Sequence, residues 1–304
     1  SNPGGFDYEA WLLERGVRAT GYVRTSPDNH KLTQVAGGSS AAINRLRERV
    51  RMHFDAVLGE APYSALLAAL AMGEQRAIPT AQWEVFRATG VAHLVSISGL
   101  HISLVAVLAG ALAGRAWSLW PRALLWQPRR RVAALAAFVA AGAYAALAGF
   151  AVPAQRAWVM VAVAALTHAL RREMATRDVL ALALGAVLLL DPASVLAGGF
   201  WLSFGAVAAI LLVAGGRLPR RRGWLWALHE GARVQLALAL ATLPALVLLF
   251  QTYPVLSPLA NALAVPVVSF IVTPLVLLAI VVQWAWLLEG AHAVMVPLMA
   301  VLEF

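Results

Sequence analysis

HLVSISGLHI, residues 93–102, decides the fold, because a mostly polar part of the chain ends there and a long apolar part begins. This stretch and the residue after it contain two histidines, three serines and a glycine: His93, His101, Ser96, Ser98, Ser103 and Gly99. Polar side chains at membrane depth are costly unless they line a path or find partners within the protein. We therefore expect the stretch to form the entrance of a polar route, with His93, Ser96, Ser98, Gly99 and His101 at its mouth.

The composition is that of an integral membrane protein. Of the 304 residues, 61% are hydrophobic and only 13% are charged, which is far from the balance of a soluble domain. The net charge of +9 is compatible with a nucleic-acid partner, but arginines gathered in cytoplasmic loops explain most of it. Cysteine is absent, which excludes disulfides and thiol catalysis. The chain has no leader-like start and ends in an apolar run, so we expect a part of a longer protein.

Apolar segments follow one another from residue 92 onward. They cover residues 94–113, 132–150, 154–170, 178–190, 194–214, 232–250 and 259–288, and another begins near 293. A helix needs roughly 20 residues to cross a bilayer, so the shorter segments should extend past these limits. The pattern predicts an all-α polytopic membrane protein, entered through a small α+β region outside the cytoplasm.

Arginines predict how the chain is oriented. Twelve of them follow the first, third and fifth apolar segments: Arg115, Arg122, Arg129, Arg130, Arg131, Arg171, Arg172, Arg177, Arg217, Arg220, Arg221 and Arg222. The intervening turns carry no Arg or Lys. Loops rich in Arg and Lys stay in the cytoplasm, so residues 1–90 and the His93 stretch should face the opposite side.

The first 90 residues are of ordinary polarity. Residues 16–24 alternate as a short strand does, Pro27 to Asn29 predict a turn, and residues 31–35 could return as a second strand. Residues 42–58 form an amphipathic helical pattern. Its arginines lie mostly off the apolar face: Arg45, Arg47, Arg49 and Arg51. They could collect DNA or lipid phosphates, or the helix could simply pack on its own domain with a solvated basic side.

The segment 255–288 is too long for one simple span. Asn261, Pro266 and Pro274 interrupt it, and we favour a short re-entrant piece at 258–272 followed by a span from 274. Broken helices beside a cavity are common in transporters. In this interpretation Asn261 caps a half-helix. The alternative is one long helix with a kink at proline.

Two further groups of residues are candidates for the route. Gln155 and Arg156 begin the third apolar segment. Arg156 could contact phosphate through its planar guanidinium, or could snorkel to lipid or a carbonyl. Phe200, Trp201 and Phe204 could stack on bases, although an interfacial aromatic belt and plain packing are equally ordinary roles.

The two histidines leave several interpretations open. His93 and His101 are eight residues apart and have no third ligand nearby in sequence, so a metal site is disfavoured. A Ser98–His101 nucleophile pair lacks an acidic residue to orient the histidine. Hydrogen bonds that hold a bent entrance and direct contact with a substrate both fit better. We expect no metal, no cofactor and no catalytic residue.

Six stretches resemble, in order, the ComEC competence family, the inner-membrane channel for transforming DNA. They are NPGGFDYEAWLLERGVRATGYV (Asn2–Val23), ALLAALAMGEQ (Ala65–Gln75), FRATGVAHLVSISGLHISL (Phe86–Leu104), PAQRAWVM (Pro153–Met160), GFWLSFGAVAAI (Gly199–Ile210) and LANALAVPVVSFIVTPL (Leu259–Leu275). The resemblance puts Arg156 on the arginine of the family's Arg-Ala motif. Trp201 departs from it, since Gln is often expected there.

The resemblance implies a domain order. Residues 1–40 would be the end of an extracytoplasmic OB-like domain, residues 41–90 amphipathic helices at the outer membrane face, and residues 91–304 a competence-type helical channel domain truncated at its C-terminus. In many members a metallo-β-lactamase-like domain, proposed to degrade one strand, lies C-terminal. This chain has no HxHxDH-like cluster, so we expect no nuclease activity from it.

The resemblance also implies a function, the passage of single-stranded DNA across the bacterial inner membrane during natural transformation. The residues expected on the path are His93, Ser96, Ser98, Gly99, His101, Gln155, Arg156 and Asn261. The chain has no GxxxxGK[ST] phosphate loop, so we expect a separate cytoplasmic ATP-dependent motor, together with an outer DNA receptor and membrane lipid, as partners. A secondary transporter or channel for a small anion is the alternative, and a scaffold that only anchors partner domains is a further one.

Overall fold

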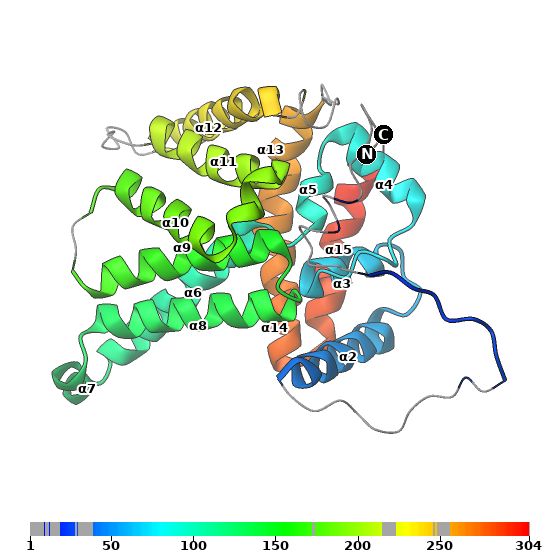
Figure 1. The fold of residues 1–304 in the computed structure, drawn as a ribbon, viewed down its shortest axis with the longest axis horizontal. Coiled ribbons are helices and arrows are strands. Elements are labelled where there is room, and N and C mark those ends of the chain that lie inside the picture. Colours follow the sequence, from blue (N-terminus) through cyan, green and yellow to red (C-terminus); the bar gives the residue numbers. More distant parts are fainter. Residues whose placement is uncertain are drawn as a thin grey trace.

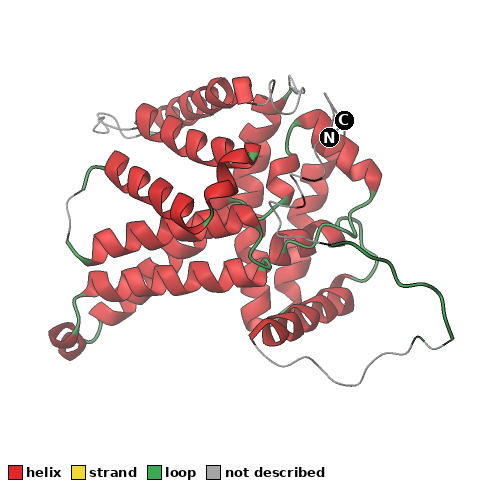
Figure 2. Cartoon of the chain, viewed as in Figure 1, coloured by secondary structure: helices red, strands yellow, loops and turns green. Residues whose placement is uncertain are grey.

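The structure is a computed structural model that describes residues 9, 12, 19–27, 29, 39–171, 174–214, 223–245, 247 and 256–303. Its described residues form helices, turns and coil and contain no strand (Figure 2). The helices are α2 (Ser39–Leu58), α3 (Ser64–Met72), α4 (Thr80–Thr89), α5 (Ala92–Val95), α6 (Gly99–Ser118), α7 (Pro121–Trp126), α8 (Arg129–Leu147), α9 (Val152–Ala169), α10 (Thr176–Leu190), η1 (Pro192–Leu196), α11 (Gly198–Ala214), α12 (Trp224–Ala245), α13 (Ser257–Val267), η3 (Val268–Val272), α14 (Thr273–Val282) and α15 (Ala285–Leu302). The expected helical membrane fold is confirmed at this level.

Four described helices are long and apolar enough to cross a membrane. They are Gly99–Ser118, Arg129–Leu147, the continuous helix Ser257–Val282, and Ala285–Leu302. The apolar helix Gly198–Val213 is shorter. The expected apolar segments therefore correspond to helices, but several of these helices fall below the length or hydropathy that spanning requires.

The helices form two sets that run in different directions. In Figure 1, α6, α8 and α9 lie side by side, whereas α13, η3 and α14 form a single column that runs across them, with α15 beside it. Small residues hold the first set together: a side-chain carbon at Gly110 of α6 would come within 2.9 Å of the Ala133 carbonyl of α8. Close approach through glycine is typical of helix packing in membranes.

The second set shares its core with the N-terminal helices. Buried side chains of α2, α3 and α4, such as Phe54, Leu67 and Phe86, pack in one cluster with Leu287 and Met295 of α15. The amphipathic helix expected over residues 42–58 is thus confirmed, and Val50, Phe54 and Leu58 of its apolar face pack on protein. The hydroxyl of Tyr63 donates to Glu303 at 2.9 Å, and burial together with this carboxylate raises the pKa of Tyr63.

The N-terminal strands find less support. Asn29 closes a turn on Ser26 as expected, with its backbone N–H donating to the Ser26 carbonyl at 3.1 Å. However, residues 19–24, the described part of the expected strand 16–24, are coil, so the predicted α+β character is not found there. Two strands without a wider sheet are marginally stable. Residues 31–35, the expected partner strand, lie outside the described residues.

The predicted break in the segment 255–288 is wrong in its position. Residues 257–282 form one continuous helix, with a π-helical turn at Val268–Val272. Proline lacks an N–H and its ring crowds the carbonyl four residues earlier. For Pro274 that carbonyl belongs to Phe270, inside the wider π turn, which accommodates the defect without a break. The helix ends instead at Gln283, whose φ of 58° is left-handed, and α15 begins two residues later.

Candidate functional site

The predicted entrance is held by local hydrogen bonds. Ser98 is the N-cap of α6: its hydroxyl accepts from the backbone N–H of His101, and its own N–H donates to Nδ1 of His101, both at 3.4 Å. This reciprocal capping satisfies two donors at the helix start. Of the interpretations open for Ser98 and His101, the structure supports the hydrogen bonds that hold a bent entrance.

His93 lies in the one-turn helix α5, and Ser96 follows that helix just before α6. The hydroxyl of Ser96 donates to the His93 carbonyl at 2.9 Å, and Nδ1 of His93 lies 3.2 Å from the Gly90 carbonyl. The His93 side chain is exposed, whereas that of His101 is fully buried. The two histidines therefore differ in access to solvent. Contact between His93 and a substrate stays a prediction.

His101 connects α6 to the crossing helix, Ser257–Val282. Its Nε2 lies 3.2 Å from the hydroxyl of Ser269 in the π-helical turn, and both residues have no exposed surface. Because Nδ1 accepts from the Ser98 N–H, a neutral imidazole carries its proton on Nε2 and donates to Ser269. A buried imidazole with both ring nitrogens satisfied is stable in this apolar surrounding.

The glycine of the entrance lies against α9. A side-chain carbon at Gly99 would meet Cβ of Ala157 at 3.6 Å, so the start of α6 contacts the helix that carries Gln155 and Arg156. Gln155 is exposed, and its amide donates to the Phe150 carbonyl at 2.6 Å. Since Phe150 has a left-handed φ of 50°, this hydrogen bond supports the tight turn between α8 and α9.

Arg156 points into the protein. It is only 5% exposed, and its guanidinium lies so close to α11 that a side-chain carbon at Gly199 would meet one terminal nitrogen at 3.0 Å. Snorkelling to lipid does not describe this position. Arg156 and Gly199 come from two of the stretches that carry the family resemblance, and the structure brings them into contact.

Asn261 lies within α13, five residues from its N-cap, so it does not cap a half-helix as expected. Its amide donates to the Ser257 hydroxyl at 2.9 Å, and its Oδ1 is buried without a partner in the described structure. The hydroxyl of Thr273 is likewise buried and without a described partner. Asn261, Ser269 and Thr273 follow one another at multiples of four, a spacing that places polar groups along one helical face.

Sequence reasoning missed Ser269 and Thr273. A usable signal was present, because two hydroxyl residues four apart in an otherwise apolar segment, with Asn261 eight residues earlier, define a polar stripe. It went unused because the prolines suggested a broken segment, and a break at residue 272 would have separated Ser269 from Thr273.

The aromatic candidates divide into buried and exposed rings. Phe200 and Phe204 pack together, with ring centroids 5.0 Å apart, in a cluster with Ala183 and Val187 of α10. Both rings are covered, which leaves no face open for stacking in this structure. Trp201 is exposed, and its indole N–H donates to the Val195 carbonyl at 2.9 Å.

The four arginines of α2 fall into two pairs, one bonded within the protein and one exposed. Arg47 donates to the Met72 carbonyl at the end of α3, at 3.2 Å, and Arg51 pairs with Glu74 at 3.0 Å. Arg45 and Arg49 are exposed and form no ion pair within the described residues. Only this second pair, four residues apart on the helix, is free for an external phosphate.

These contacts form one connected series through the bundle. Ser269 of the crossing helix contacts His101, the start of α6 contacts α9 through Gly99, and Arg156 of α9 contacts Gly199 of α11. The contacts are between packed side chains. The apolar pocket at Leu70, Phe86 and Met295 and the cavity at Gly110, Arg129 and His168 are lined by none of these residues.

Comparison with known proteins decides the family. The profile described as "Competence protein" matches residues 70–304. The chain belongs to the competence protein family. The match covers the stretches around His93, Arg156, Gly199 and Asn261, so the resemblance noticed in the sequence is confirmed. With its apolar helices, the chain is a multi-pass helical membrane protein.

Individual relatives match most of this chain. It is 40% identical over 287 residues to "Competence protein ComA" of Neisseria gonorrhoeae, covering 92% of this chain and 39% of that protein. It is 31% identical to "Uncharacterized protein YcaI" of Escherichia coli, and the match covers 93% of this chain and 36% of that protein. It is 30% identical to "Recombination protein 2" of Haemophilus influenzae, with 92% of this chain and 35% of that protein covered. The chain thus spans little more than a third of these relatives. No solved structure matches it.

Proposed function

We propose that the chain forms the membrane part of a channel that passes single-stranded DNA into the cytoplasm during natural transformation. Membership of the competence family and the likeness to ComA support a role in DNA uptake. The observation that carries the channel proposal is the connected series from Ser269 through His101 and Gly99 to Arg156 and Gly199. Polar side chains from three separate segments, Ser269, His101 and Arg156, are buried inside an apolar bundle, where isolated polar groups are costly.

In this proposal the structure represents a closed state. His101 and Arg156 are buried in side-chain contacts, so a strand can pass only when the crossing helix or α11 moves away from α6 and α9. The path then offers hydroxyls, an imidazole, an amide and one guanidinium. Such sparse positive charge suits transport, because conduction requires binding weak enough for release.

The surroundings follow from the same proposal. Residues 1–90 face the outside of the bacterial inner membrane, and the exposed Arg45 and Arg49 there attract incoming DNA. A separate ATP-dependent motor pulls the strand on the cytoplasmic side, an outer receptor delivers it, and lipid surrounds the helices. The chain itself acts as a conduit and has no nuclease role.

The test uses the full-length protein in a transformable bacterium that lacks its own copy. Arg156→Gln and His101→Gln should reduce nuclease-resistant, internalised labelled DNA while DNA bound at the surface and protein in the membrane stay unchanged. Gly205→Ala is the control, because a side-chain carbon there meets nothing within 4 Å. Normal uptake by both variants would remove these residues from the path.

A second measurement separates DNA from small anions as the cargo. Labelled oligonucleotide should bind the purified protein, and binding should weaken with rising salt, since each phosphate contact releases counterions. Competition by millimolar phosphate or sulfate at constant ionic strength should have no effect. Equal competition by these anions would instead support an anion transporter.

A further inference from the structure

A cavity of about 500 Å³ opens at the end of the bundle that carries the arginines. Its walls come from three helices: Gly110 and Ala111 of α6, Arg129, Arg130 and Ala133 of α8, and His168 of α9, with Pro128 just before α8. None of these residues belongs to the series of contacts around His101 and Arg156. The cavity is therefore a separate feature with a chemistry of its own.

The cavity carries positive charge that the described protein does not neutralise. None of the ion pairs among the described residues includes Arg129, Arg130, Arg131 or Arg171. Arg131 and Arg171 both act electrostatically on Arg130. The Nε of Arg130 is buried and has no hydrogen-bond partner in the described structure. Like charges held together around an unsatisfied donor favour a bound anion.

Glycines shape the cavity. A side-chain carbon at Gly114 would meet Nε of Arg129 at 3.3 Å, and one at Gly110 would meet the Ala133 carbonyl at 2.9 Å. The absence of side chains at these two positions lets α6 and α8 approach closely and leaves room for the Arg129 guanidinium beside α6. The close packing of α6 and α8 therefore shapes the cavity.

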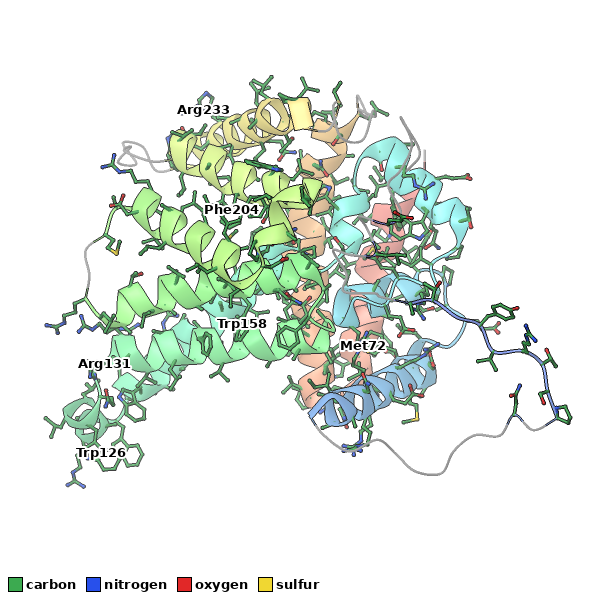
Figure 3. The ribbon with its side chains drawn as sticks, viewed as in Figure 1. Met72, Trp126, Arg131, Trp158, Phe204 and Arg233 are labelled. Carbon is green, nitrogen blue, oxygen red and sulfur yellow. The ribbon has the colours of Figure 1, made fainter. Side chains whose placement is uncertain are left out.

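The surroundings place this cavity at the level of lipid headgroups. The short helix α7 exposes Trp126 by 85% and Leu125 by 86%, and Figure 3 shows Trp126 at the same end of the molecule as Arg131. Nε1 of Trp117 donates to the Gln127 carbonyl at 2.9 Å. Tryptophan and arginine together at the ends of apolar helices are typical of a membrane–water interface.

We propose that this cavity binds the phosphate headgroup of an anionic phospholipid in the leaflet that the arginine loops face. Arg129 and Arg130 donate to the phosphate, and His168 of α9 lines the same cavity. The acyl chains run along exposed apolar side chains of the adjoining helices, such as Leu112 of α6 and Leu135 of α8. These exposed leucines favour a lipid over a nucleic acid, whose sugars and phosphates prefer water. Basic pockets between helices on the cytoplasmic side suit such headgroups.

The experiment measures lipid retained by the full-length protein. Protein purified in mild detergent is mixed with phosphatidylglycerol or with phosphatidylcholine, and bound lipid is counted by native mass spectrometry. The wild type should retain phosphatidylglycerol selectively, and its melting temperature should rise with that lipid, because a ligand specific for the folded state stabilises it. Arg129→Gln and Arg130→Gln should each weaken lipid retention about fivefold. This factor corresponds to the binding free energy of about 1 kcal/mol that one arginine contributes near an anionic surface.

Arg122→Gln is the matched control. It removes the same charge from the exposed helix α7, outside the cavity lining, and should leave retention nearly unchanged. Equal weakening by Arg122→Gln would show general attraction to the membrane surface and would overturn the site. Displacement of the lipid by inorganic phosphate would assign the cavity to a free anion, and displacement by single-stranded oligonucleotide would assign it to nucleic acid. The wild-type lipid selectivity and melting shift test the proposal even where a variant folds poorly.

Discussion

His101 and Ser269 form a buried hydrogen bond of 3.2 Å between side chains that are 168 residues apart in the chain. This bond joins the start of α6 to the π-helical turn of the helix that crosses it. Both side chains are inaccessible to solvent, so water cannot take the place of either partner in this state. It fixes the crossing helix at one position relative to the entrance.

Ser269→Ala should therefore destabilise the protein. The change leaves one nitrogen of a buried imidazole without a partner, which costs about 1–3 kcal/mol. Thermal unfolding in detergent measures the effect. Ser118→Ala is the control, because it removes a half-buried hydroxyl that bonds only to the Gly114 carbonyl of its own helix. A double-mutant cycle with His101→Ala should show strong coupling, and additive effects of the two changes would contradict the bond.

Gly199→Ala should lower stability where Gly205→Ala does not. Both changes replace glycine by a better helix former in α11, and at Gly205 the new carbon meets nothing within 4 Å. At Gly199 it meets the Arg156 guanidinium at 3.0 Å, and forcing that buried side chain aside costs about 1–3 kcal/mol. The melting temperatures of the two variants provide the comparison. Equal values would mean that Arg156 relaxes freely.

Tyr144→Phe should cost more stability than Tyr63→Phe. The hydroxyl of Tyr144 is buried and donates to the Leu70 carbonyl of α3 at 2.8 Å, so its removal orphans that carbonyl at a cost of about 1–3 kcal/mol. The hydroxyl of Tyr63 donates to Glu303 at a site that water reaches, and water replaces it. Equal melting temperatures for the two variants would argue against a tight α3–α8 contact.

Arg47→Gln and Arg49→Gln should separate structure from DNA binding on α2. Arg47 satisfies the Met72 carbonyl, so its loss should lower the melting temperature. Arg49 is exposed, so Arg49→Gln should leave stability unchanged and should reduce the salt dependence of oligonucleotide binding by about one phosphate contact. An unchanged salt dependence would remove Arg49 from the outer DNA surface.

Local patterns were sufficient to predict most helices. The apolar segment expected over residues 132–150 corresponds to Arg129–Leu147, and that expected over 178–190 to Thr176–Leu190. Hydrophobic length and helix-breaking residues define such segments without tertiary information. The arginine pattern also agrees with the fold, since the ends of α6, α8, α9 and α10 that carry arginines lie on one side of the molecule (Figure 1).

Local patterns did not predict where the long helix ends or which distant residues contact His101 and Arg156. The prolines at 266 and 274 suggested a break, yet the helix continues, and the π turn directly before Pro274 accommodates the missing N–H of that proline. The actual end lies at Gln283, which adopts the left-handed conformation usually taken by glycine or asparagine. The partners of His101 and Arg156 come from segments far away in the chain, and no local period encodes such contacts.

The close approach of Gly199 to Arg156 has a consequence for the evolution of the family. A side chain at one position and arginine at the other compete for the same space, so the two positions should vary together among homologues. Where residue 199 is alanine or larger, we expect a smaller residue than arginine at 156, and alignment of many family members would reveal this coupling even though 42 intervening positions separate the pair along the chain.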